Sequence, residues 1–495
     1  MEPKTTLANG LNEIANFTFT SKYARYSEKY KRRESWKEAI TRVEEMHVEK
    51  YNFLSEEDKQ EIKWAFDLVR DKRAVPSMRS MQFGGPAVTS HNARMFNCSC
   101  RHIDSIRAFA ECFYLLLCGC GVDFGLTKKY LNRLPDLVDA NSKTGTVLTY
   151  AVEDSIEGWA DSLEAQLNSY FKNTAYSGRK IVFDYSKIRR KGAKLKTGGG
   201  KAPGYSGLKN AHIKIKKLFD HVIEKNEKTR IKPIDAYDIL MHCSDAVLSG
   251  GIRRAATSVV FDHDDDEMMN AKTGDWISEN PQRARSNNSV LFLRKKITET
   301  DFKKVLQSAR EFGEPGFIFA DHEDMLSNPC REIGFVPVTK DGRCGVQFCN
   351  LTSINGAKIH SIKEFRDATK AASIIGTLQA GYTNFHYLSN TSRELTEEEA
   401  LLGVSITGIM DNPKILLNAK NQKECAQIAV ETNQDWAKKL GINPAARVTC
   451  IKPEGTSSLV LGSASGIHPH HSRKYLRRIQ CNKIDNVYQY FRLFN

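Results

Sequence analysis

Several features that would quickly assign a chain to a class are missing from this sequence. No two of its 12 cysteines are spaced Cys-x-x-Cys, so neither a structural zinc site nor a thioredoxin-type motif is predicted. Twelve cysteines among 495 residues are also too few for a disulfide scaffold. Gly200-Lys201 is followed by Ala202, so there is no Walker A phosphate loop. Most of the thiols are therefore predicted to be reduced core residues.

Long apolar runs are equally scarce. The strongest, Phe113 to Val122, contains two glycines and two cysteines, and it falls short of the roughly 20 residues that a membrane helix needs. The N-terminal residues Met1 to Lys4 show no basic region followed by an apolar one, as a signal peptide would. We therefore expect a globular protein of the cytoplasm.

What the chain does have is positive charge. The formal net charge is +14 and the pI is about 9.1, which indicates an anionic partner, either nucleic acid or free nucleotides. The excess is uneven, because residues 179–201 carry nine Lys or Arg against one Asp. This stretch ends in the glycine-rich residues 198–204, which predict a loop.

Helical periodicity alternates with loops along most of the chain. Residues 1–75 are predicted to form a helical region, with an amphipathic helix over 35–50 and a second helix starting at Ser55. The remainder, 76–495, is predicted to form one body in which glycine-, proline- or asparagine-rich loops separate the helical stretches 107–118, 156–171, 234–248, 299–311 and 362–387. This alternation favours an α/β fold with parallel strands.

The most informative motif is Asn328-Pro329-Cys330-Arg331-Glu332, followed nineteen residues after its thiol by Cys349. On an extended loop the side chains of its first, third and fifth residues share one face. Alone, the motif more often indicates a buried structural cysteine beside a surface glutamate. Companion segments occur in a fixed order around it: Asn97-Cys98, 249–254, 286–290, 453–458 and 465–469.

In kind and in order these segments resemble the large catalytic chain of ribonucleotide reductases, from about Pro76 to about Arg478, and most closely the adenosylcobalamin-dependent class. The resemblance implies a ten-stranded α/β barrel of two half-barrels, with the helical region as a cap and Cys330 on a finger loop inside. It also implies the reduction of ribonucleotides to 2′-deoxyribonucleotides by a thiyl-radical mechanism, with adenosylcobalamin as cofactor.

Catalytic roles follow from the resemblance. Cys330 corresponds to the thiyl that abstracts the 3′-hydrogen, Glu332 to the base and Asn328 to the hydrogen-bonding residue that positions the substrate. The reaction consumes two electrons, which paired thiols can supply by closing to a disulfide. Cys98 and Cys349 match the family's reducing pair, and Cys100 and Cys344 are close enough in sequence to be alternatives.

Binding residues are implied in the same way. The substrate side comprises Asn97 and the phosphate loop Gly455, Thr456, Ser457 and Ser458, which as a bare sequence is equally an N-cap turn. The deoxynucleotide effector is expected at two loops, through Arg189, Lys191, Lys201, Gly250, Gly251 and Arg253; a solvated charged loop is the alternative for residues 188–204. The family places His468 beside the substrate without a metal, so no metal ligand is predicted.

Two other functions stay open at this stage. One is the iron-dependent class, in which another subunit oxidises Cys330. The other is a non-catalytic basic protein that binds nucleotides or nucleic acid. A nucleic-acid face normally interleaves aromatic residues with basic ones, and the basic cluster has only Phe183, Tyr185 and Tyr205 near it. The sequence therefore favours a nucleotide substrate and effector, an external thioredoxin-like dithiol, no membrane and no direct contact with nucleic acid.

The end of the chain departs from the family pattern. The chain ends at Asn495, shortly after the phosphate loop, whereas the family continues through the last barrel strands and a tail with a cysteine pair. We therefore expect an incomplete barrel that needs its missing part, or a second polypeptide, for activity.

Overall fold

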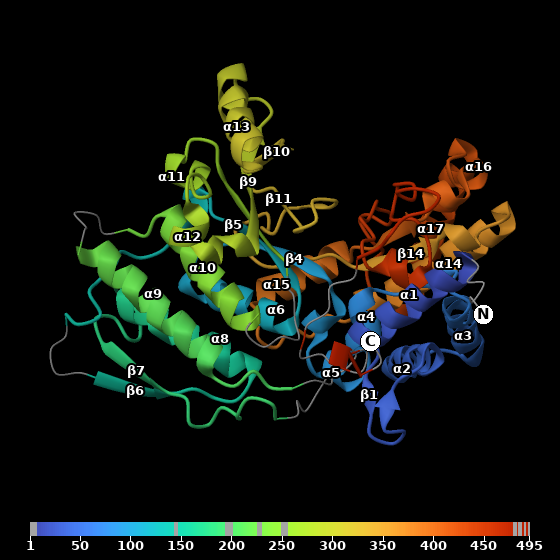
Figure 1. The fold of residues 1–495 in the computed structure, drawn as a ribbon, viewed down its shortest axis with the longest axis horizontal. Helices are drawn as coiled ribbons and strands as arrows, with labels where there is room; N and C mark the ends of the chain where they lie inside the picture. Colours follow the sequence, from blue (N-terminus) through green and yellow to red (C-terminus); the bar gives the residue numbers. More distant parts are fainter. Residues whose placement is uncertain are drawn as a thin grey trace.

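The computed structural model describes residues 7–142, 147–193, 201–224, 230–248, 256–478, 483, 488–489 and 492–493. Figure 1 shows a chain whose N-terminal helices and last helices lie on one side and whose residues 147–193 and 201–224 lie on the other. Gly250, Gly251 and Arg253 lie outside the described residues.

Three helices open the chain: α1 (Leu7–Lys22), α2 (Trp36–Lys50) and α3 (Glu56–Arg70). Ser35 begins α2 with a capping box in which Ser35 and Glu38 satisfy each other's backbone N–H groups. The Ser55 hydroxyl accepts the Asp58 N–H at the start of α3. The helices predicted over 35–50 and from Ser55 are thus confirmed.

The main sheet has six strands in the order β10-β9-β8-β5-β4-β13. Its first five are parallel to one another, and β13 runs antiparallel to β4. The side chains of β4 and β5 are buried throughout, as expected where a parallel sheet is covered on both faces. The strand bounds are β4 Cys98–His102, β5 Gly121–Gly125, β8 Thr257–Asp262, β9 Ser286–Leu293, β10 Gly316–Ala320 and β13 Gln347–Phe348.

A second set of strands begins directly after β13. Strand β14 (Leu351–Asn355) pairs in parallel with β15 (Gly403–Thr407) and antiparallel with β3 (Ala74–Val75). Val404 of β15 also forms a parallel bridge with Thr449. One group of five parallel strands is therefore followed by a second parallel group, which is the arrangement that the sequence analysis expected for two half-barrels.

Helices cover these sheets: α6 (Ile106–Cys118), α8 (Ile156–Tyr170), α10 (Pro233–Leu248), α13 (Glu299–Phe312), α14 (Ile362–Ala380) and α17 (Ala419–Leu440). Five match the predicted helical stretches. The stretch predicted over 362–387 was too long, because α14 ends at Ala380 with Gly381 as its C-cap. Tyr387 then stacks on Tyr114 of α6 at 4.5 Å between ring centroids.

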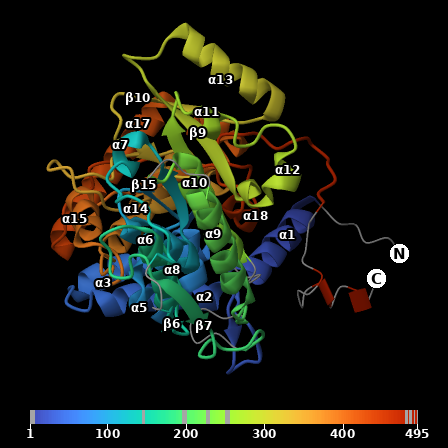
Figure 2. The same ribbon diagram turned by 90° about the vertical axis from the view of Figure 1, so that its left-hand side faces the viewer.

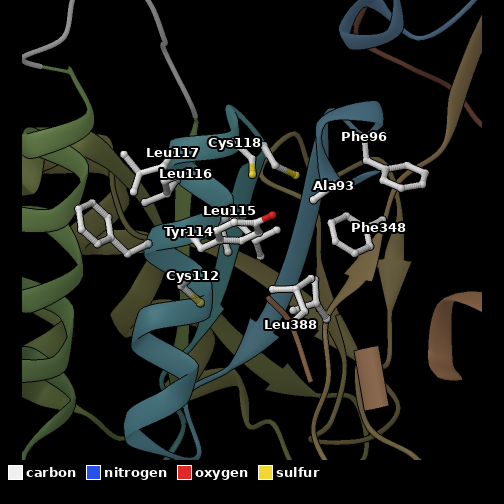
Figure 3. Packing of buried hydrophobic residues seen from close by; sticks show 14 of the residues in the cluster. Ala93, Phe96, Cys112, Tyr114, Leu115, Leu116, Leu117, Cys118, Phe348 and Leu388 are labelled. Atoms are coloured by element: carbon white, nitrogen blue, oxygen red, sulfur yellow. The ribbon is translucent and has the colours of Figure 1, made fainter. Parts of the chain in front are cut away.

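The core is densest around α6. All of its side chains are buried except that of Arg107, and Figure 3 shows Tyr114 and Leu115 lying between the helix and Leu388, with Phe96 and Phe348 nearby. The Phe96 and Phe348 ring centroids are 4.9 Å apart. Residues 113–117, the start of the apolar run Phe113 to Val122, are therefore part of this core. No helix among the described residues is long and apolar enough to cross a membrane.

Two parts of the chain extend from this body. Strands β6 (Val147–Ala151) and β7 (Lys180–Asp184) pair in parallel and lie with α8 and α9 (Ser206–Glu224) at one side of the molecule (Figure 1). Helix α13 and the edge strand β10 project at the top, as the turned view in Figure 2 also shows. The segment 321–346, here called the finger segment, connects β10 to β13.

Candidate active site

The finger segment presents Cys330 at the tip of a tight turn. Strands β11 (Leu326–Ser327) and β12 (Gly334–Phe335) pair as a short hairpin. Asn328 closes the turn, since its backbone N–H donates to the Ile333 carbonyl at 3.2 Å and its carbonyl accepts the Arg331 N–H at 2.9 Å. Asn328 is completely buried, whereas Cys330 is exposed. The turn therefore fixes an accessible thiol on a rigid support.

Asp123, in the middle of buried strand β5, anchors this turn. Its carboxylate accepts the Ser327 N–H at 3.1 Å and the Arg331 guanidinium at 2.9 Å, and it also accepts the Ser258 hydroxyl of β8. Burial raises the pKa of Asp123, and Arg331 and Ser258 oppose that shift. Sequence reasoning missed this pair. A lone aspartate within the run Gly121–Gly125 was the available signal, because a buried carboxylate needs a partner.

Cys98 and Cys349 lie next to each other and next to Cys330. Phe348 pairs with Ser99 in the antiparallel ladder, so Cys349 comes opposite Cys98. The Cys349 N–H donates to the Cys98 carbonyl at 2.9 Å, and the Cys98 N–H donates to Cys349 Sγ at 3.0 Å. The Cys98 thiol hydrogen-bonds with those of both Cys330 and Cys349. Three thiols from three separate segments thus form a continuous row.

The alternative thiols lie elsewhere. Cys100 pairs with Gln347 in the same ladder, two residues beyond Cys98. Cys344 bridges to Val338 within the finger segment, and its sulfur accepts from Arg133 at 3.7 Å. Neither is placed opposite Cys349.

The environment keeps all three thiols of the row protonated. The hydrogen bond to Cys98 raises the pKa of Cys330. At Cys98 the hydrogen bond with Cys330 lowers the pKa, but the bond with Cys349 and burial together raise it well above its usual value. Burial raises the pKa of Cys349. Nucleophilic chemistry requires a thiolate, whereas transfer of a hydrogen atom requires an intact S–H bond. The site therefore suits hydrogen-atom transfer.

Glu332 and Asn328 provide polar groups beside this row. Asn328 Oδ1 accepts the Ile333 N–H at 3.1 Å, but its Nδ2 has no hydrogen-bond partner, and Oε2 of Glu332 has none either. Buried polar atoms are normally hydrogen-bonded, so both are available to a ligand. Burial raises the pKa of Glu332, and the positive charge of Lys452 opposes that shift. A raised pKa strengthens the carboxylate as a base.

The predicted phosphate loop leads into the short helix α18 (Ser457–Leu461). Gly455 is exposed, Thr456 half-buried, and Ser457 and Ser458 are buried. The Ser457 hydroxyl donates to the buried carboxylate of Glu454, which also accepts from Ser353 of β14.

Lys452 connects this loop to the thiols. Its buried ammonium lies 3.2 Å from Glu454 and donates to the Ser353 hydroxyl at 3.2 Å. Its positive charge also acts on Cys330 and Glu332 by lowering their pKa. Sequence reasoning did not select Lys452, although it directly precedes the Pro453–Ser458 motif. Asn97 lies immediately before β4, where its carbonyl accepts the Gly121 N–H at 2.8 Å.

The predicted effector residues that the structure describes lie apart from this site, after β7. Arg189 donates to Asp154 at 2.6 Å, whereas Lys191 and Lys201 are exposed. Gly192 and Ala202 pair across the base of this loop, with the Gly192 N–H donating to the Ala202 carbonyl at 2.9 Å. The structure thus separates these cations from the thiols.

The thiol geometry predicts which disulfide forms. Mild oxidation of the native chain should link Cys98 to Cys349, because the two residues face each other across one ladder and lie within the Cα separation of about 7 Å that a disulfide tolerates. Peptide mapping after alkylation of the free thiols would detect the bond. The Cys344→Ser variant should give the same product. A product that links Cys349 to Cys100 or to Cys344 would contradict the pairing.

Comparison with known proteins relates this geometry to a family. Residues 135–219 match the family model described as "B12-dependent ribonucleotide reductase, insertion domain". Over these residues the chain is similar to the B12-dependent ribonucleotide reductases. The resemblance found in the sequence is thereby confirmed. The matched residues include β6, β7 and α8 and most of α9, a unit that the sequence analysis did not separate from the rest of the body.

Curated relatives are similar to this chain over most of its length. A probable adenosylcobalamin-dependent ribonucleoside-triphosphate reductase of Dictyostelium discoideum is 29% identical over 68% of this chain and 44% of its own length. The adenosylcobalamin-dependent ribonucleoside-triphosphate reductase of Lactobacillus acidophilus is 24% identical over 96% of this chain and 75% of its own. The chain therefore spans less than half of the Dictyostelium relative and three quarters of the Lactobacillus one.

Solved structures identify the fold. A B12-dependent (class II) ribonucleotide reductase superposes with a TM-score of 0.77 at 21% identity, covering 92% of this chain and 75% of that one. The class Id ribonucleotide reductase alpha subunit of Actinobacillus ureae gives a TM-score of 0.50 at 14% identity, with the same coverage. The predicted α/β barrel fold of this family is confirmed, and its closer likeness is to the B12-dependent class.

Proposed function

We propose that this chain reduces ribonucleotides to 2′-deoxyribonucleotides with a thiyl radical on Cys330. The observation that carries the proposal is the hydrogen-bonded row of Cys330, Cys98 and Cys349 beside Glu332. The names of the curated relatives support a ribonucleoside triphosphate as the substrate. An external dithiol of the thioredoxin type restores the row after each reaction.

The steps balance in atoms and electrons. The Cys330 radical takes the 3′-hydrogen, Glu332 takes the 3′-hydroxyl proton, and the 2′-hydroxyl departs as water with a proton from the reducing thiol pair. Cys98 and Cys349 then deliver a hydrogen atom to C2′ and a second electron to the 3′-ketone as they become a disulfide, and Glu332 returns its proton to the 3′-oxygen. Cys330 then returns its hydrogen to C3′ and is a radical again. Asn328 orients the substrate through its unpartnered Nδ2.

Adenosylcobalamin is the proposed cofactor, and it supplies the oxidising equivalent that generates the radical on Cys330. The arrangement of the thiols fits such a bulky group, because Cys330 is exposed at the tip of the turn while Cys98 and Cys349 are buried. The exposed thiol can meet a cofactor without exposing the reducing pair to solvent.

The nucleotide is proposed to bind between the finger turn and the phosphate loop. Gly455, Thr456, Ser457 and Ser458 offer backbone N–H groups and hydroxyls to the phosphates, as loops before helices do. Lys452 supplies positive charge between the phosphates and the reacting carbon. Asn97, at the start of β4, contacts the ribose side.

Regulation and assembly form the finer part of the proposal. A deoxynucleotide effector binds the exposed cations Lys191 and Lys201 together with Arg189, within the segment that matches the insertion domain.

A second polypeptide pairs with edge strand β10, where Phe317 and Phe319 are 40% and 38% exposed. Unpaired edges with exposed apolar residues favour such pairing. The effector role of Gly250, Gly251 and Arg253 stays a prediction. A location in the cytoplasm stays a prediction too.

A single-turnover assay tests the proposed reaction. The fully reduced chain, with a ribonucleoside triphosphate and adenosylcobalamin but no external dithiol, should form up to one deoxynucleotide per chain and lose two titratable thiols. A thioredoxin-type dithiol should then permit further turnovers. The assay should be repeated with the part of the Lactobacillus acidophilus relative that this chain does not match, added as a separate polypeptide. If nucleotide and cofactor bind in both assays but no deoxynucleotide forms in either, the non-catalytic nucleotide-binding function is favoured instead.

A further inference from the structure

Two histidines and a glutamate meet where the matched insertion segment joins the body. Nε2 of His91 lies 2.9 Å from Oε1 of Glu157, and Nε2 of His386 lies 3.1 Å from the same oxygen. The three ligand atoms all lie within 4.8 Å of one another. His91 follows α5 (Pro86–Ser90), Glu157 lies in the first turn of α8, and His386 lies after α14. None of these residues belongs to the thiol site.

Neighbouring contacts hold the three side chains in place. The His91 and His386 rings stand edge to face with centroids 5.1 Å apart. The ring of Tyr114, in α6, also lies edge to face with that of His386, with centroids 6.3 Å apart. Asn92, next to His91, accepts the Asn384 N–H at 3.0 Å and so connects the two histidine segments. A set of ligands that is fixed before binding loses little conformational entropy when it binds.

A second group of contacts fixes α8 against the same segment. Tyr387, next to His386, donates its hydroxyl to Asp161 at 2.7 Å. Arg107 of α6 donates to Glu164 at 2.6 Å and to the Tyr387 carbonyl at 2.7 Å. The carboxylate of Glu157, one and two turns before these acids, is therefore held toward both histidines.

We propose that His91, Glu157 and His386 bind a divalent first-row transition metal ion that fastens α8 to the body. Two imidazole nitrogens and one carboxylate oxygen are a donor set typical of zinc and non-haem iron sites. Bonds of about 2.0–2.2 Å to a common ion place adjacent ligand atoms roughly 3.0–3.5 Å apart. The separation between His386 and Glu157, 3.1 Å, lies in this range, and the separation between His91 and Glu157, 2.9 Å, lies just below it. Three protein ligands leave further positions for water.

No local sequence pattern indicates this site, because Glu157 lies 66 residues after His91 and 229 residues before His386. The sequence analysis considered metal binding only from the spacing of the cysteines and at His468. His470 lies 3.0 Å from the carboxylate of Asp411, and this pair belongs to no group of three ligands among the described residues, so it provides a matched histidine–carboxylate control.

Cobalt binding tests the proposal on the full chain after treatment with a chelator. Co²⁺ titrated into the wild-type chain should give one equivalent with visible ligand-field bands, and Zn²⁺ should displace it. The variants Glu157→Gln and His386→Ala should each raise the Kd for Co²⁺ at least about tenfold, while His470→Ala should leave it unchanged. Circular dichroism would verify that the variants fold.

The spectrum also separates this site from the cysteines. Binding to thiolates adds an intense sulfur-to-cobalt band in the near ultraviolet, which the proposed nitrogen and oxygen donors cannot produce. Equal Co²⁺ affinity in wild type, Glu157→Gln and His386→Ala, or bands from thiolate alone, would overturn the proposal. The three side chains would then be a hydrogen-bonded cluster that needs no ion.

Discussion

Replacing Cys330 by serine is expected to abolish deoxyribonucleotide formation and to leave nucleotide binding nearly unchanged. The serine O–H bond is too strong to exchange its hydrogen with a carbon radical, so the reaction loses its first step. The rate should fall by at least about 1,000-fold, equivalent to roughly 4 kcal/mol in the barrier. Product formation and equilibrium nucleotide binding should both be measured, because only the first should change.

Two further variants sharpen this result. Cys344→Ser, in the same finger segment but outside the row of three thiols, should retain activity. Glu332→Gln should slow the chemical step while still allowing the radical to form on Cys330, since it removes the base and not the thiol. Appreciable reduction by Cys330→Ser with any radical source would refute the role of the thiol.

Breaking the pair of Asp123 and Arg331 should cost about 3 kcal/mol of unfolding free energy, because the partner that remains is a buried charge without compensation. Asp123 is completely buried and the Arg331 side chain is only 26% exposed. The loss should also reduce turnover, since the pair fixes the turn that carries Cys330. Chemical denaturation of Asp123→Ala, Arg331→Ala and the double variant gives the coupling energy between them.

A surface pair in the next segment provides the control. Arg294 and Asp321 lie 2.8 Å apart, but their side chains are 53% and 76% exposed, so their coupling should not exceed about 1 kcal/mol. If Asp123 and Arg331 couple no more strongly than this control pair, the buried pair is not what holds the finger turn.

Local patterns in the sequence predicted a large part of the fold. The helices over 35–50, 107–118 and 156–171 follow from apolar spacing and from capping residues such as Ser35, which act within a few residues of the helix start. Helix 362–387 was predicted too long. Its apolar residues continue past Gly381 because Tyr387 packs on α6, and periodicity does not distinguish helical from tertiary packing.

The sequence by itself determined the resemblance to ribonucleotide reductases and the kinds of side chain that the chemistry needs, because the order and spacing of the motifs are properties of the chain. Only the tertiary structure decided that Cys349 comes opposite Cys98 and not Cys100, which depends on the register between β13 and β4. It alone brought Arg331 to Asp123, and His386 to His91 and Glu157. These contacts join residues more than 60 positions apart in the sequence. Strand pairing and helix packing bring such residues together in space, and no local periodicity encodes them.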